Sequence, residues 1–112
     1  MNEKHVLFIQ IYTELLPEIR DIAKQHGYAI AVHGSLRRDF DLIAVPWVED
    51  AADPAMLLSG ILQGIKLNKT WIEQCYATKE LKPYGRVSYA ILLGADMYID
   101  LSIMEFNRMV LK

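Results

Sequence analysis

The sequence predicts a single α+β domain, 1–112, with a mostly antiparallel or mixed four-stranded sheet and two or three helices packed on one face. Apolar residues recur at helical spacing near the start of the chain and again after Pro54. Four short apolar runs are typical of buried strands. No repeat, low-complexity tract or linker divides the 112 residues, so we expect one hydrophobic core.

The first element is predicted to be an amphipathic helix that ends at Gly27. Its apolar positions recur every three or four residues: Leu7, Ile11, Leu15, Ile19 and Ile22. Glycine suits the left-handed conformation that often terminates a helix. Pro17 lies inside this pattern and predicts either a kink or two shorter helices that meet there.

The remaining elements are predicted from glycine, proline and capping residues, which mark where helices and strands begin and end. Strands are predicted at 28–33 and 40–45, and a helix is predicted after Asp53, which is a suitable N-cap before Pro54. Strands at 87–93 and 98–104 flank a short loop, which favours a β-hairpin. Signals over 66–83 conflict, and the structure of this stretch stays open.

Composition narrows the range of functions. Twelve Lys and Arg against 14 Asp and Glu give a net charge of -2, which argues against binding duplex nucleic acid by phosphate neutralisation. The single Cys75 has no partner for a disulfide and no neighbours for a zinc site. The sequence shows neither a signal peptide nor a membrane span, so we expect a cytoplasmic protein.

Asp39 and Asp41 are the first candidates for chemistry. Alternate residues of a strand share a face, so these two carboxylates point together. A divalent cation would offset their mutual repulsion, and carboxylate oxygens are ligands that Mg²⁺ prefers. The alternative is that both acids are solvated at the edge of a strand.

Asp100 is a third candidate, because an acid in the middle of an otherwise apolar strand requires an explanation. If its strand lies beside the strand of Asp39 and Asp41, three carboxylates converge. Such a cluster suits one or two magnesium ions and phosphoryl or nucleotidyl transfer. The alternative is a position on a solvent-facing side of the sheet.

A short segment before Asp39 carries the parts of a phosphate-binding loop. Gly34 lets the backbone approach a phosphate closely, and Ser35 offers a hydroxyl and an amide. Arg37 and Arg38 can bind phosphate oxygens in a bidentate manner. His33 could orient a phosphate or a carboxylate, and Arg86 could present its guanidinium to a base or phosphate. Both are interpreted more simply, as a structural residue at a strand end and as part of a turn.

Together these residues resemble the nucleotidyltransferase superfamily that includes DNA polymerase β and the minimal nucleotidyltransferases of bacteria. Gly34-Ser35, Asp39-Phe-Asp41 and Asp100 match the family's motifs. The resemblance implies that Gly34 and Ser35 hold a nucleoside triphosphate, that Asp39 and Asp41 bind magnesium, and that Asp100 helps to activate the attacking hydroxyl. Segments 33–47 and 98–104 also resemble small proteins of phages and prophages, which implies a bacterial or phage-infected host cell.

The sequence departs from this family in one respect. Family members have a helical turn between Gly-Ser and Asp-x-Asp, whereas only Leu36, Arg37 and Arg38 intervene here. Either the arginines bind the phosphates on a shortened loop, or the fold is retained without transferase activity. The alternative function is therefore an inactive phage-type binding or regulatory module that acts through a protein partner. A weaker alternative is single-strand nucleic-acid binding through Arg37, Arg38 and Arg86. A working transferase would require a partner chain, a homodimer or a small acceptor.

Overall fold

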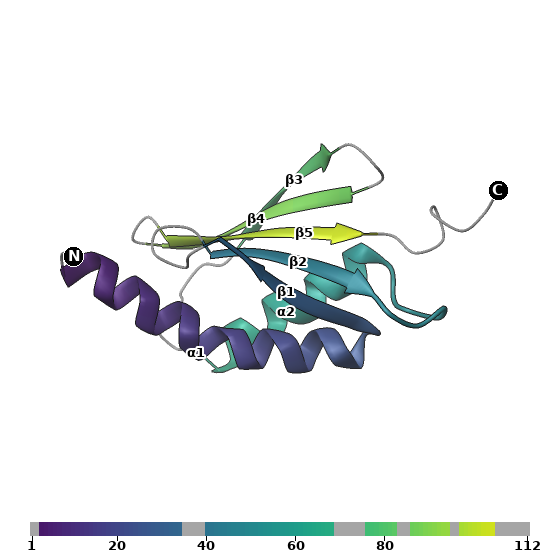
Figure 1. Cartoon of the computed structure of the whole chain (residues 1–112), viewed down its shortest axis with the longest axis horizontal. Coiled ribbons are helices and arrows are strands. Elements are labelled where there is room, and N and C mark those ends of the chain that lie inside the picture. The colour runs from purple at the N-terminus through teal and green to yellow at the C-terminus, as the bar shows by residue number, and fades with distance from the viewer. Residues whose placement is uncertain (1–2, 35–39, 69–75, 83–85, 95–96, 105–112) are drawn as a thin grey trace.

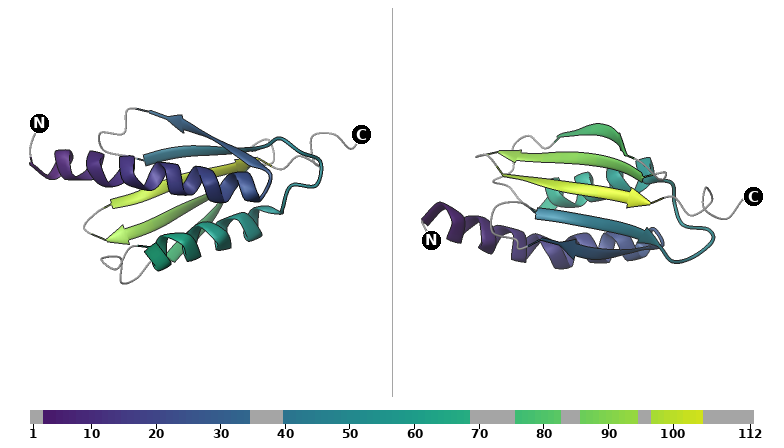
Figure 2. Two further views of the ribbon diagram at one scale, coloured as in Figure 1. Left: turned by 90° about the horizontal axis from the view of Figure 1, so that it is seen from below. Right: turned by 45° about the horizontal axis from the view of Figure 1, so that its top comes forward.

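A computed structural model describes residues 3–34, 40–68, 76–82, 86–94 and 97–104. In chain order the elements are α1 (Glu3–Gln25), β1 (Tyr28–His33), β2 (Phe40–Pro46), α2 (Pro54–Asn68), β3 (Tyr76–Lys82), β4 (Arg86–Gly94) and β5 (Met97–Met104). The two helices lie on the same side of a twisted sheet, as Figure 1 shows from the side and Figure 2 shows from below. The α+β class and the single layer of helices are therefore confirmed.

The sheet has the strand order β1-β2-β5-β4-β3. Only β2 and β5 pair in parallel, and the other three pairs are antiparallel. The expectation of four strands was wrong, because β3 forms a fifth strand within the stretch that the sequence left open. The predicted hairpin of β4 and β5 is confirmed.

The first helix is one continuous element rather than two shorter helices. Pro17 is exposed, so its ring does not interrupt the apolar side of α1. That side buries four residues completely on both sides of Pro17: Tyr12, Leu15, Ile19 and Ala23. Burial of a continuous apolar stripe stabilises the helix enough to tolerate the one backbone donor that proline lacks.

Both predicted helix caps are confirmed. Gly27 follows α1 with φ of +87°, a conformation that glycine adopts without a steric penalty. The carboxylate of Asp53 accepts a hydrogen bond of 2.9 Å from the N–H of Met56, in the first turn of α2. These caps fix where each helix meets the sheet.

The hydrophobic core lies between the helices and one face of the sheet. Alternate residues of β2 and β5 are buried there, for example Phe40, Leu42, Ile99 and Leu101. In α2, the side chains of Leu57, Ile61 and Ile65 are fully buried against the same face. The intervening strand residues lie on the opposite face, which no described element covers (Figure 2). Neither described helix is long and apolar enough to cross a membrane.

Candidate site on the uncovered face of the sheet

Three titratable residues lie side by side across three neighbouring strands. His33 of β1 is opposite Asp41 of β2, and Asp41 is opposite Asp100 of β5. Their neighbours Val32, Leu42 and Leu101 lie on the helix-covered side, so alternation places all three on the uncovered face. The sequence predicted that Asp100 would approach the Asp-x-Asp segment only if its strand lay beside that of Asp41. The structure fulfils this condition, because β5 pairs directly with β2.

Asp41 and Asp100 are a like-charged pair. Neighbouring strands are about 4.8 Å apart, so directly opposite carboxylates repel each other. Both side chains are partly buried rather than fully solvated, which weakens the screening of this repulsion by water. A bound cation would offset the repulsion between the two carboxylates.

Ser88 of β4 orients Asp100. Its hydroxyl donates a hydrogen bond of 3.0 Å to Oδ1 of Asp100. Ser88 is only 4% exposed and is the one buried polar residue of the described chain. A buried hydroxyl needs a partner, and a carboxylate oxygen is a strong acceptor. The bond therefore holds Asp100 at a defined position in the sheet.

Gly34 brings the main chain close to Asp41. It has φ of +92°, and a Cβ atom built on it would lie 3.4 Å from Oδ2 of Asp41. A positive φ at this value favours glycine strongly. The main chain at Gly34 thus lies directly beside the first carboxylate.

The carboxylates lie in a shallow hollow of about 310 Å³. Besides backbone and apolar atoms, polar side chains from four strands line it: His33, Asp41, Arg86, Ser88, Asp100 and Ser102. The sequence indicated that Ser102 shares a side with Asp100. It gave no sign of Ser88, and it offered Arg86 only as part of a turn or as a nucleic-acid contact, because only the register of β4 against β5 brings both residues to the same hollow.

Four of the predicted site residues, Ser35, Arg37, Arg38 and Asp39, lie outside the described residues. Within the described ranges, no three His, Cys, Asp or Glu side chains form a group that could hold a metal ion. Of the three acids predicted to converge, the structure therefore describes two, Asp41 and Asp100.

A comparison with models of known protein families gives no match for this chain, and a comparison with curated proteins gives no significant match.

Proposed function

We propose that this protein binds magnesium and a nucleoside triphosphate on a nucleotidyltransferase-like fold, and transfers a nucleotidyl group to an acceptor. The observation that carries the proposal is the direct opposition of Asp41 and Asp100 on adjacent parallel strands. Two acids that are far apart in sequence meet on the face that no described element covers, in a hollow of about 310 Å³. The motif resemblance of Gly34-Ser35 and Asp39-Phe-Asp41 supports the same assignment.

The metal would be held by Asp41 and Asp100 together with Asp39, which precedes Asp41 by two positions in the sequence. Magnesium usually takes a few carboxylates and completes its shell with water and phosphate oxygens. The repulsion between Asp41 and Asp100 supports this role, because it makes the site more favourable with a cation than without one.

The triphosphate would lie on the side of Gly34. The turn at Gly34 brings the main chain beside Asp41, so phosphate oxygens bound there would also reach the metal. Ser35, Arg37 and Arg38 follow directly in the sequence and are the proposed phosphate contacts. The two arginines would replace the amides of the family's helical turn, for which the three intervening residues are too few.

The reaction would be an in-line displacement at the α-phosphorus. An acceptor hydroxyl forms a bond to phosphorus through its oxygen, and the bond to the bridging oxygen of pyrophosphate breaks. The hydroxyl proton passes to the carboxylate of Asp100, which the Ser88 hydroxyl holds in place. Magnesium, when bound, would neutralise the charge on the phosphate oxygens.

Thermal unfolding tests the proposal. The protein would be melted with ATP, GTP, CTP and UTP in turn, each with and without magnesium, because a ligand that binds only the folded state raises the melting temperature. We expect a rise of about 4 °C or more that requires both nucleotide and magnesium. The same measurement with Asp41→Asn should show no rise.

The matched control is Asp21→Asn, which removes an exposed acid from α1 and should keep the full rise. A rise without magnesium, or an equal rise in Asp41→Asn, would contradict the metal site. No rise with any nucleotide would contradict the proposed function and favour the inactive binding module that acts through a protein partner.

A further inference from the structure

The two edges of the sheet differ in charge. The edge strand β3 carries Lys79, Glu80 and Lys82 among its seven residues. The opposite edge, β1, has the sequence YAIAVH and carries no lysine, arginine, acid or proline. Charges and proline are the usual means by which proteins prevent an edge strand from pairing with another chain. The β1 edge lacks this protection.

The outer side of β1 presents backbone hydrogen-bonding groups. The N–H of Trp47 donates to the C=O of Gly27 at 3.0 Å, which extends the ladder between β1 and β2 by one residue. Tyr28, the next residue, is opposite Pro46, which has no N–H to donate. Residues of an antiparallel pair alternate between bonding their partner and facing away from it. The groups that face away from β2 therefore belong to Tyr28, Ile30 and Val32.

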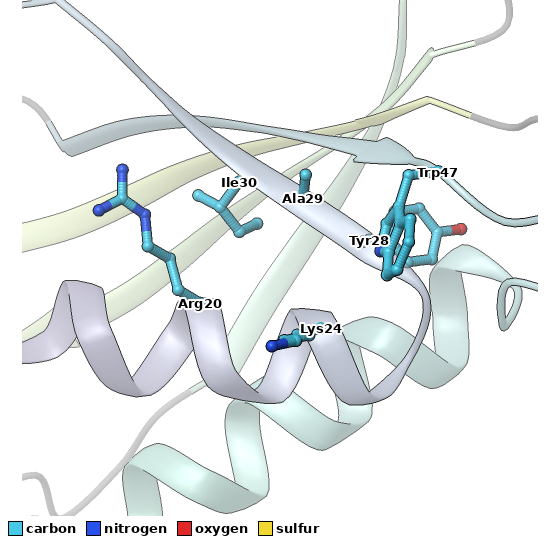
Figure 3. Close-up of a pocket in the computed structure, with 6 residues that line it drawn as sticks. All are labelled: Arg20, Lys24, Tyr28, Ala29, Ile30 and Trp47. Atoms are coloured by element: carbon cyan, nitrogen blue, oxygen red, sulfur yellow. The ribbon is translucent and has the colours of Figure 1, made fainter.

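A pocket of about 330 Å³ adjoins the first half of this edge. The described residues that line it are Arg20, Lys24, Tyr28, Ala29, Ile30 and Trp47. In the view of Figure 3, Trp47 and Tyr28 overlap near the start of β1, and Arg20 extends from α1 toward the strand. Trp47 is 60% exposed, and exposed tryptophans that flank a pocket are frequent anchors of protein contacts.

The charged side chains that line this pocket indicate which kind of segment would bind there. Both charged side chains among its described lining residues are cationic, Arg20 and Lys24, and they lie four positions apart on the exposed side of α1. Like charges at this spacing repel, so an anionic group beside them is favoured. A second copy of this chain would bring another Arg20 and Lys24, whereas an acidic segment would neutralise both.

We propose that β1 binds an extended acidic segment of another protein, which adds to the sheet as a sixth strand. Its main chain would bond to the outward groups of Ile30 and Val32, and an apolar side chain would fill the pocket beside Trp47. An acidic side chain would pair with Arg20 and Lys24. This surface is distinct from the hollow of Asp41 and Asp100, so the inference does not depend on the proposed nucleotide site.

Selection from a displayed library of random linear peptides tests this inference. We expect the selected peptides to alternate apolar residues and to carry Asp or Glu. Their dissociation constants, measured by fluorescence anisotropy, should rise by about tenfold or more in Arg20→Glu. The matched control is Lys79→Glu, which makes the same change of charge on the opposite edge and should leave binding unchanged.

The backbone contact has its own measurement. Ile30→Pro removes an N–H that faces away from β2 and should abolish binding. Ile30 also packs against the core, so Ile30→Pro changes the packing of the protein as well as its edge. A second experiment therefore leaves the protein unaltered and N-methylates the selected peptides at alternate residues. Binding should be lost for only one of the two methylation patterns.

Three results of the peptide experiments would overturn the inference. These are a failure to select peptides, equal binding of the selected peptides by Arg20→Glu, and equal tolerance of both methylation patterns. Concentration-dependent dimerisation that Ile30→Pro abolishes would show that a second copy, rather than an acidic partner, occupies the edge.

Discussion

The ring of Tyr12 in α1 stacks on the ring of Phe40 in β2, with centroids 4.6 Å apart and ring planes inclined by 27°. The hydroxyl of Tyr12 also donates a hydrogen bond of 3.4 Å to the C=O of Tyr98 in β5. One helical side chain thus contacts both strands that carry the acids. Phe40 directly precedes Asp41, so packing on one face of the sheet fixes the position of the carboxylate on the other.

Phe40→Ala should lower the free energy of unfolding by about 3–5 kcal/mol, because it removes a fully buried ring and leaves a cavity under Tyr12. Urea denaturation measures the change. Met56→Ala, at a position that is 58% exposed, is the control and should alter stability by less than about 0.5 kcal/mol. A loss below about 1 kcal/mol for Phe40→Ala would contradict the central place of this stack in the core.

Ser88→Ala should lower the free energy of unfolding by about 1 kcal/mol, because the buried hydroxyl bonded to Asp100 is removed. Ser102→Ala, on the same face of the neighbouring strand, is the matched control and should have a smaller effect. In an Asp100→Ala background the effect of Ser88→Ala should change, since the two residues share the bond. Strictly additive effects of the two substitutions on the free energy of unfolding would argue against this hydrogen bond.

Asp100→Asn should raise the free energy of unfolding by up to about 1 kcal/mol at low ionic strength without divalent cations. The substitution removes one of two opposed charges and keeps an oxygen that can accept the bond from Ser88. Added salt should reduce the difference from the unaltered protein, because salt screens partly solvated charges. A salt-independent loss of stability would show that repulsion between Asp41 and Asp100 is not the dominant effect.

Gly27→Ala should lower the free energy of unfolding by about 1–3 kcal/mol, since its φ of +87° disfavours a side chain. A Cβ atom there would also lie 2.7 Å from Cγ2 of Val48. Gly34→Ala is an informative comparison, because its φ is similar but the nearest atom among the described residues, Oδ2 of Asp41, is 3.4 Å away. Equal losses of unfolding free energy at the two positions, measured by urea denaturation, would mean that the contact with Val48 adds nothing to the destabilisation.

The sequence by itself determined the features that depend on a few neighbouring residues. The apolar stripe of α1 was predictable in part, because Leu15 and Ile19 are buried as expected, whereas Leu7 is 52% exposed. The cap at Gly27 and the N-cap at Asp53 were predictable from local spacing. The same holds for the alternation that puts Asp100 on the face opposite Ile99 and Leu101. Each follows from backbone geometry and from the period of a helix or strand, whatever the rest of the chain does.

Only the tertiary structure decided which strands are neighbours. The sequence made the meeting of Asp41 and Asp100 conditional, and the parallel placement of β5 beside β2 fulfilled that condition. The fifth strand, the bond from Ser88 to Asp100 and the uncharged edge at β1 also depend on strand order and register. These are set by how helices and strands from distant parts of the chain pack together, a balance that no short segment of the sequence contains.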